Sequence, residues 1–334
     1  MIRKLPVVLA LLAILISAAC TSQAASTDEK TLVVAVAGAL TGPSAQDGTD
    51  IKRGAELAVD HINEQGGING SKIELIFEDD RSDPKEAANI ANKLVDDQRV
   101  LAVIGHYNSS CTLAGAPIYN KAGLVEITSG STSPAVSEAG PYTFRTIVTD
   151  AFQGDFVARW MVEDDGFKRI AILFENDDYG VGLKDIIATQ VVAYGGEIVG
   201  EESFYLGETK DFTPLITKIR GLDPDALFIA GLYNEGALIA KQAAEVGWNP
   251  PLYGVDGLYS APYIELGGSA VEGTKVVGFF HTGSTDPFVH QFVQDFQAKF
   301  DVLPGTYAAY GYDAMLSIAE AMKENGADRT KIKD

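Results

Sequence analysis

The sequence predicts an α/β protein built from two doubly wound lobes of parallel sheet that are joined by a hinge. From residue 32 onward, short apolar runs typical of buried strands alternate with segments of helical periodicity. The alternation occurs once before and once after a segment near residues 144–147. With 334 residues, the chain is long enough for two separate hydrophobic cores.

The first half of the chain is expected to build one sheet. Residues 101–104 are continuously apolar, as in a strand covered on both faces of a parallel sheet. Asp83 and Pro84 suit the N-cap and the first position of a helix. The expected strands are residues 32–36, 73–77, 101–104 and 124–127, and the expected helices are residues 51–62, 84–95 and 113–121.

The second half repeats the pattern, and its last two helices are expected to return to the first lobe. The chain should cross between lobes near residues 144–147 and again near 279–283. This predicts an N-terminal lobe of residues 31–146 plus 284–334 and a C-terminal lobe of residues 147–283. The expected strands are residues 170–174, 198–204, 226–230 and 251–255, and the expected helices are residues 182–194, 212–219, 237–246, 288–300 and 307–324.

The first residues have the parts of a bacterial secretory signal peptide, which we place within residues 1–25. Arg3 and Lys4 form a basic head, residues 5–16 form an apolar core, and small residues follow. The core is shorter than the roughly 20 apolar residues that span a bilayer. The sequence therefore predicts export to a periplasmic or other extracytoplasmic location.

Cys20 has two possible fates. Its surroundings resemble the lipobox of bacterial lipoproteins, in which the cysteine is acylated and becomes a lipid anchor, the protein's one expected contact with the membrane. Ser17 departs from that pattern, because Leu usually stands three residues before the cysteine. The alternative is ordinary cleavage near Ala19 or Ala25, which would discard Cys20.

Charge and cysteine content exclude two further features. A formal net charge of −20 argues against nucleic acid as a partner, because phosphate backbones attract basic surfaces. Cys111 is the only cysteine after residue 20, so no intramolecular disulfide is expected. Cys111 is either a small buried side chain beside Ser110 or a reactive exposed thiol.

Four loops at the carboxyl ends of predicted strands carry the polar chemistry, at the edge where such sheets bind ligands. Each loop alone is typical of a helix cap or a turn. Together they offer hydroxyl and N–H donors from one half and a carboxylate with aromatic rings from the other, the set that a zwitterionic amino acid requires. The loops are residues 106–112, 128–134, 232–234 and 256–257.

An ordered series of motifs over residues 31–325 resembles the leucine/isoleucine/valine-binding protein family of periplasmic receptors. The resemblance implies the type I periplasmic-binding fold, no catalysis and no cofactor, and delivery of an amino acid by a monomeric receptor to the permease of an ABC importer. The matching stretches are residues 38–43, 66–70, 79–85, 105–106, 169–172, 179–180 and 211–212.

The resemblance also implies roles for individual residues. Ser109 falls where the family binds the ligand carboxylate, and Thr132 where a hydroxyl contacts both ends of the ligand. Gly130 falls where a backbone carbonyl receives the ammonium, and Asp256 where an acid pairs with it. The expected rings of the second lobe are Tyr179 and Tyr233, and the further candidates for the pocket are Asp47, Tyr107 and Ser131.

Three departures from the family pattern are visible. Asp47 stands where many branched-chain receptors have Tyr, which favours a more polar side-chain pocket. Ser82 and Asn108 replace a disulfide that some members have. The chain stops at Asp334, before the closing segment that the family implies, so we expect it to be a fragment.

Rival functions lack their motifs. No G-x-G-x-x-G follows the first strand, and no G-x-S-x-G is present, so neither a dinucleotide enzyme nor a hydrolase is expected. The four histidines do not cluster at metal-ligand spacing, and no metal site is expected. The remaining alternatives are a binding protein for a neutral aliphatic amino acid that serves an importer and an exported sensory receptor for an amino acid, amide or carboxylate.

Overall fold

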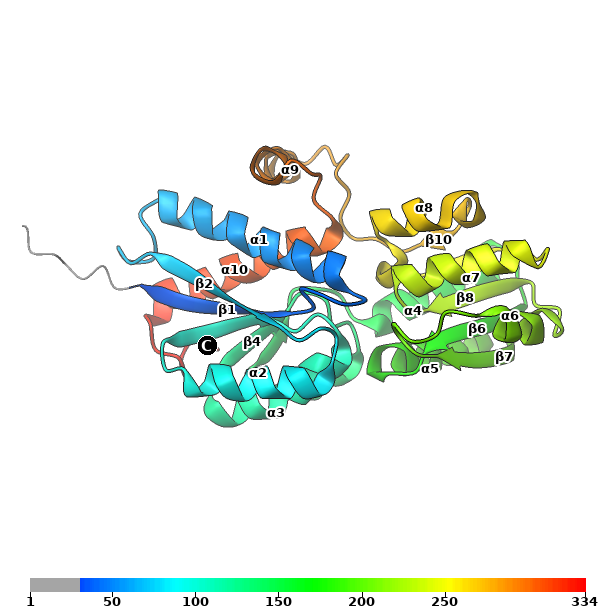
Figure 1. Ribbon diagram of the computed structural model, residues 1–334, viewed down its shortest axis with the longest axis horizontal. Coiled ribbons are helices and arrows are strands. Elements are labelled where there is room, and N and C mark those ends of the chain that lie inside the picture. Colours follow the sequence, from blue (N-terminus) through cyan, green and yellow to red (C-terminus); the bar gives the residue numbers. More distant parts are fainter. Residues whose placement is uncertain (1–30) are drawn as a thin grey trace, which may run out of the picture.

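Two lobes of parallel sheet, each flanked by helices on both faces, lie end to end in the computed structural model (Figure 1). The structure describes residues 31–334. The predicted signal peptide and Cys20 lie outside the described residues. Both sheets have five strands, and every strand pairing is parallel. The predicted fold class is confirmed.

The first sheet has the strand order β2-β1-β3-β4-β5. Its central strands are buried along their whole length, which explains their continuous apolar sequence. Helices α1 and α10 cover one face, and α2 and α3 cover the other (Figure 1). The strands are β1 (Leu32–Gly38), β2 (Ile73–Asp79), β3 (Val100–Gly105), β4 (Val125–Thr128) and β5 (Thr143–Arg145), and the helices are α1 (Ala45–Glu64), α2 (Pro84–Asp96), α3 (Ser109–Ala122) and α10 (Thr306–Asn325).

The second sheet has the order β10-β9-β8-β6-β7. Successive residues of β6 point to opposite faces, so Ile170 and Ile172 pack with α4 and α5, whereas Ala171 and Leu173 pack with α6 and α7. The strands are β6 (Arg169–Glu175), β7 (Glu197–Phe204), β8 (Ala226–Ala230), β9 (Leu252–Gly254) and β10 (Lys275–Val276), and the helices are α4 (Asp150–Arg159), α5 (Asp178–Ala193), α6 (Thr213–Arg220), α7 (Tyr233–Glu245) and α8 (Ala261–Gly267).

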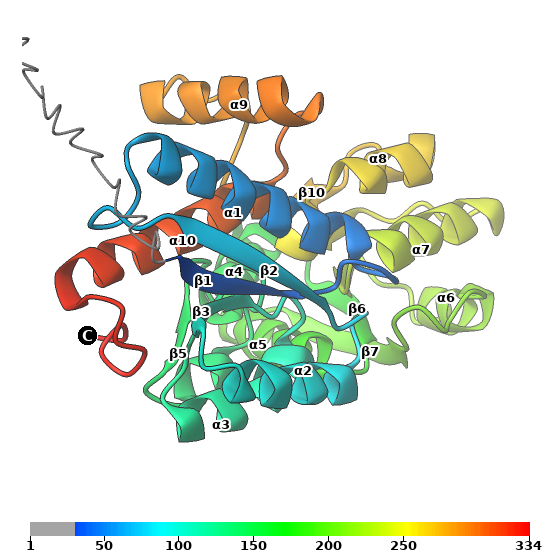
Figure 2. The same cartoon turned by 60° about the vertical axis from the view of Figure 1, so that its left-hand side comes forward.

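The helices near the C-terminus of the chain lie against the first lobe. Helix α10 packs on α1, where a Cβ at Gly54 would lie 1.9 Å from the carbonyl oxygen of Ala308. Only glycine permits that approach of two backbones. Helix α9 (Pro287–Phe300) lies outside α1 (Figure 2). The exact lobe boundaries at 146/147 and 283/284 stay a prediction.

Local signals placed several elements correctly. Asp83 caps α2 by accepting a 2.8 Å hydrogen bond from the backbone N–H of Lys85. Helix α1 begins earlier than its apolar periodicity indicated, and α4 and α8 had no strong apolar stripe to reveal them. Cys111 is buried and free, as the first of the two interpretations expected. None of the helices within residues 31–334 is both long and apolar enough to cross a membrane.

Candidate ligand-binding cleft

A small cavity lies between the lobes, at the carboxyl ends of both sheets. All of the predicted ligand residues except Tyr233 border it. Its volume is about 10 Å³, on the order of one water molecule. The lining residues are Tyr107, Asn108, Ser109, Gly130 and Thr132 from the first lobe, Tyr179, Leu232, Asp256 and Gly257 from the second, and Tyr307 from α10.

The first lobe presents a helix N-terminus and a hydroxyl-rich loop to this cavity. Ser109 is the first residue of α3, where the N–H groups of the opening turn have no partner within the helix. Its hydroxyl accepts a 3.3 Å hydrogen bond from the backbone N–H of Ser133. A helix N-terminus of this kind favours negative charge, so this wall suits a carboxylate.

Thr128 and Ser131 hold the shape of the hydroxyl-rich loop. Thr128 Oγ1 accepts hydrogen bonds from the N–H groups of Gly130 (3.3 Å) and Ser131 (3.0 Å) and donates to the carbonyl of His106 (2.5 Å). The Ser131 hydroxyl donates to the carbonyl of Tyr107 at 2.9 Å. Ser131 is therefore placed behind the cavity wall and ties the two loops together.

Beneath these loops lies a fully buried pair of Asp80 and His106. Asp80 Oδ2 is 2.6 Å from His106 Nδ1, and His106 Nε2 is 3.2 Å from the Tyr119 hydroxyl. Neither the pair nor Tyr119 reaches the cavity. Their hydrogen bonds fix the backbone of the loop that begins at His106.

The second lobe presents Asp256, which follows β9. Its carboxylate accepts hydrogen bonds from Gln153 Nε2 at 2.8 Å and from the Tyr307 hydroxyl at 3.1 Å. Burial raises the pKa of Asp256, and these two donors oppose the rise. Both donors are neutral, so within the described residues no ion pair balances this carboxylate.

Asp150 adds a second buried carboxyl group close to Asp256. Gln153 bridges the two, because its Nε2 also lies 3.3 Å from Asp150 Oδ1. Burial, followed by repulsion from Asp256, raises the pKa of Asp150 well above its usual range. No local signal indicated Asp150, Gln153 or Tyr307, because the first two lie at the start of an unpredicted helix and the third lies at the start of α10.

Several buried polar atoms around the cavity have no hydrogen-bond partner in the part of the chain that the structure describes. Thr132 lies near enough to lower the pKa of Asp150, but its hydroxyl makes no hydrogen bond of normal geometry. An unpaired buried polar group costs about 1–3 kcal/mol, so such a concentration indicates a polar ligand. The unpaired atoms are Asn108 Oδ1, Thr132 Oγ1, Asp150 Oδ2 and Tyr179 Oη.

Besides Ser131, two further predicted residues lie next to the cavity but not in its wall. Tyr233 donates a 3.3 Å hydrogen bond to the carbonyl of Pro43, across the gap between the lobes. Asp47 lies behind Tyr107 and accepts a 2.7 Å hydrogen bond from its hydroxyl. Asp47 instead borders a neighbouring cavity of about 440 Å³, which shares Tyr307 with the first.

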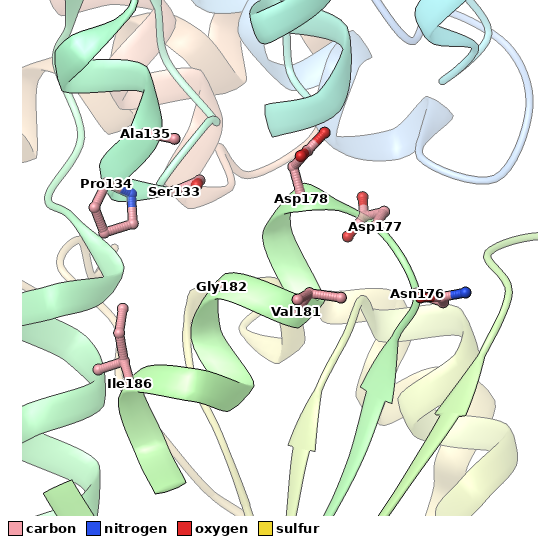
Figure 3. Close-up of a pocket in the computed structure, with 9 residues that line it drawn as sticks. All are labelled: Ser133, Pro134, Ala135, Asn176, Asp177, Asp178, Val181, Gly182 and Ile186. Carbon is pink, nitrogen blue, oxygen red and sulfur yellow. The ribbon is translucent and has the colours of Figure 1, made fainter. Parts of the chain in front are cut away.

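The rim of the cleft also has a groove, of about 570 Å³, between residues 133–135 and the start of α5 (Figure 3). Asp177 caps α5 there by accepting a 2.8 Å hydrogen bond from Gly180 N–H. Beside the groove, the Ser110 hydroxyl accepts a hydrogen bond from the backbone N–H of Asp178 (3.1 Å) and donates to Asp177 Oδ2 (3.4 Å). These bonds join the two lobes.

The model of the periplasmic binding protein family matches residues 31–333. This chain belongs to that family. Members are solute-binding proteins and not enzymes. Within residues 31–334, the structure has no group of three or more His, Cys, Asp or Glu side chains placed to hold a metal ion.

Curated members of the periplasmic binding protein family are similar over most of their length. An amino acid binding protein of Pseudomonas aeruginosa is 36% identical over 303 residues, which is 89% of this chain and 79% of that protein. The Leu/Ile/Val-binding protein homolog 1 of Brucella suis is 35% identical over 291 residues, 86% of this chain and 77% of that protein.

Solved structures of the family share the architecture. A leucine binding protein from Thermotoga maritima has a TM-score of 0.85 at 31% identity, over 90% of this chain and 86% of that one. A branched-chain amino acid binding protein from Streptococcus pneumoniae, in complex with isoleucine, has a TM-score of 0.84 at 31% identity. The match covers 91% of this chain and 87% of that one. A solute binding protein from Rhodopseudomonas palustris, in complex with 3,4-dihydroxybenzoic acid, has a TM-score of 0.82 at 26% identity. The match covers 91% of this chain and 84% of that one.

Proposed function

We propose that this protein is the exported receptor of an ABC importer and binds a neutral aliphatic amino acid between its lobes. One observation carries the proposal. The Asp256 carboxylate, which no cation balances within the described residues, borders the same cavity as the unpaired hydroxyl of Thr132 and the N-terminus of α3. The ammonium of an α-amino acid would pair with Asp256, and its carboxylate would bind the Thr132 hydroxyl and the N-terminus of α3.

Each end of the ligand has its own partners. The ligand carboxylate lies against the Ser109 hydroxyl and the first N–H groups of α3, and it accepts a hydrogen bond from Thr132. The ammonium lies between Asp256 and the carbonyl of Gly130. Asp150 lies beside this site, bridged to Asp256 by Gln153, and does not touch the ligand.

The amine distinguishes the proposed ligand from carboxylic acids without an amine, which other proteins of this fold can bind. The Rhodopseudomonas palustris structure contains a carboxylate that has no amine. A ligand of that class would leave Asp256 buried and unpaired, which costs several kcal/mol. Asp256 therefore supports an amino acid, in line with the Pseudomonas aeruginosa and Streptococcus pneumoniae relatives.

Binding proceeds by closure. The ligand first meets the lobe that bears Ser109 and Thr132, and the second lobe then brings Asp256 and Tyr179 over it. Closure excludes water, which strengthens the charged contacts. A monomeric receptor, exported by its signal peptide and either free or anchored through Cys20, then presents the closed form to the permease.

Thermal-shift measurements on the twenty amino acids, together with matched amides and amine-free acids, test the proposal. A ligand that binds the folded state alone raises the melting temperature. We expect neutral aliphatic amino acids to raise it and amine-free acids of the same shape to leave it unchanged. If only amine-free acids raised it, the assignment of an amino acid ligand would be wrong.

A further inference from the structure

We infer that Asp150 is held as a neutral carboxylic acid and donates its proton to Thr132 Oγ1 when the ligand binds, which directs the Thr132 hydroxyl proton at the ligand carboxylate. The inference rests on the proposed function, in which Thr132 binds that carboxylate. Asp150 is then a positioning residue, because it acts through Thr132 and does not touch the ligand. Two buried oxygen atoms that have no hydrogen-bond partner within residues 31–334 point to this role, Asp150 Oδ2 and Thr132 Oγ1.

Asp150 and Thr132 lie side by side. The backbone N–H of Asp150 donates a 2.9 Å hydrogen bond to the carbonyl oxygen of Thr132. Both residues are buried, with exposed fractions of 0% and 1%. Burial raises the pKa of Asp150, and the Thr132 hydroxyl is close enough to oppose the rise. Because the backbone already holds the two residues together, a side-chain rotation is sufficient to pair the two oxygen atoms.

The hydrogen bonds around Asp150 and Asp256 assign the proton of this pair to Asp150. The Asp256 carboxylate accepts from two donors, Gln153 at 2.8 Å and Tyr307 at 3.1 Å. Asp150 Oδ1 has one donor, Gln153 at 3.3 Å, and Oδ2 has none in the described part of the chain. Hydrogen-bond donors stabilise the ionised form of a carboxyl group, and two neighbouring buried carboxyl groups resist ionising together. Asp256 therefore carries the charge, and Asp150 carries the proton.

The other charged groups near Asp150 do not reverse this assignment. Burial and then the charge of Asp256 raise the pKa of Asp150 well above its usual range, and Asp177 adds to the rise. Arg145 opposes it, but its guanidinium donates 3.0 Å hydrogen bonds to the carbonyl oxygens of Ser131 and Ser133. The neutral acid is thus the form that these surroundings favour.

The Thr132 hydroxyl has one proton to donate and two lone pairs to accept with. If Asp150 were ionised, it would accept that proton, and the ligand carboxylate would face a hydroxyl with nothing to donate. A neutral Asp150 donates to Thr132 instead, so the Thr132 proton goes to the ligand carboxylate. The second lone pair of Thr132 accepts from the ligand ammonium. Every donor and acceptor site of the hydroxyl is then satisfied.

Calorimetric titration of Asp150 variants, with the tightest amino acid found by thermal shift, tests the inference. Asp150→Ala removes the donor and should weaken binding by about tenfold. Asp150→Asn should restore most of that loss, because its amide oxygen can accept from Gln153 while its N–H group donates to Thr132. Glu163→Ala is the matched control, because Glu163 is exposed just after α4, and it should bind as the parent does. If Asp150→Asn bound as weakly as Asp150→Ala, the inference would be wrong.

A double-mutant cycle with Thr132→Val separates this role from a general structural one. In the Thr132→Val protein, Asp150→Ala should weaken binding no further, because no hydroxyl is left to orient. Equal losses with and without the Thr132 hydroxyl would mean that Asp150 acts independently of Thr132, and the inference would fail although the proposed function stands. If no amino acid binds the unchanged protein, the proposed function itself is wrong.

Infrared difference spectroscopy detects the proton directly and needs only the parent and Asp150→Asn, so it still decides if Asp150→Ala does not fold. At about pH 7, the difference between the two spectra should contain the carbonyl band of a protonated carboxyl group. Addition of ligand should shift this band, because the acid then donates to Thr132. Carboxylate bands in its place would show that Asp150 is ionised and would overturn the inference.

Discussion

Tyr307 donates a 3.1 Å hydrogen bond to Asp256 and thereby links α10 of the first lobe to the carboxylate of the second. Gln153, at the start of the second lobe, donates to the other carboxylate oxygen at 2.8 Å. The two donors fix the orientation of Asp256 but leave its charge unbalanced. Closure of the lobes thus sets the orientation of the Asp256 carboxylate. The ligand ammonium, in the proposed function, balances its negative charge.

Replacing Asp256 by Ala should weaken amino acid binding by about 2–5 kcal/mol, the range for removing one partner of a buried charge pair. The ligand ammonium would then be buried against neutral groups. Isothermal titration calorimetry with the tightest amino acid found by thermal shift measures the change. Glu265→Ala is the control, because Glu265 is exposed on α8, away from the cavity. Equal affinities of the Asp256→Ala protein and the parent would remove the ammonium site from the proposal.

Replacing Thr132 by Val should weaken binding by about 1–3 kcal/mol without destabilising the free protein. The shapes of the two side chains are similar, and the hydroxyl has no hydrogen-bond partner among residues 31–334. The melting temperature without ligand should therefore stay equal or rise, while the ligand-induced shift should shrink. Thr132→Ser keeps a hydroxyl and should bind nearly as the parent does. If the Thr132→Val protein had a lower melting temperature without ligand but bound the ligand normally, Thr132 would have only a structural role.

Much of the fold followed from the sequence because its signals are local. Residues 226–230 were expected as a strand and form β8 with the same bounds, since a short apolar run needs no partner to be recognised. Asp83 was identified as a cap because capping involves neighbours in the chain. Helix α4 was missed, because its apolar residues form no clear stripe and its first turn carries the buried polar pair of Asp150 and Gln153.

The site was predicted unevenly for the same reason. Ser109 and Thr132 stand in loops whose composition alone is suggestive, and they share one cavity with Asp256. Tyr307 reaches that cavity from a helix far along the chain, so only the packing of α10 reveals it. Tyr233 was expected to face the ligand; in the structure its hydroxyl donates to the Pro43 carbonyl, and its contact with a ligand stays a prediction.

Stability should depend on pH through Asp50, because burial raises the pKa of this residue from 3.8 to about 6. Between these pH values the folded protein binds more protons than the unfolded chain, so this group's contribution to stability falls as the pH rises from about 4 to about 6. Asp50→Asn removes the ionisation. It should raise the free energy of unfolding at pH 7 by up to about 3 kcal/mol, at about 1.4 kcal/mol per pKa unit, and change it little at pH 4.

Urea unfolding of the parent and the Asp50→Asn protein at several pH values between 4 and 7 measures this difference. The hydrogen bond from Gln46 to Asp50 can be kept by the new amide oxygen, so packing should change little. Asp96→Asn is the control, because Asp96 is exposed at the end of α2. If the curves for the parent and Asp50→Asn ran parallel across this range, the buried carboxyl would not titrate as its surroundings indicate.

The closed arrangement is also held by hydrogen bonds that do not involve the ligand. Asn234 Nδ2 donates to the Pro43 carbonyl at 2.7 Å, and Ser110 bonds to the start of α5 on another part of the rim. Neither Asn234 nor Ser110 borders the ligand cavity. Their contribution to affinity would therefore come through the equilibrium between open and closed forms.

Asn234→Ala should shift the unliganded protein toward the open form and weaken amino acid binding by about 0.5–1.5 kcal/mol, the usual net contribution of one hydrogen bond. The ligand must then supply the free energy of closure that the bond had supplied. Small-angle X-ray scattering should show a larger radius of gyration without ligand and the parent value at saturation. Asn92→Ala is the matched control, because the Asn92 side chain donates its hydrogen bond to a residue of the same helix, α2. An Asn234→Ala protein with the parent's radius and affinity would mean that the ligand alone holds the lobes together.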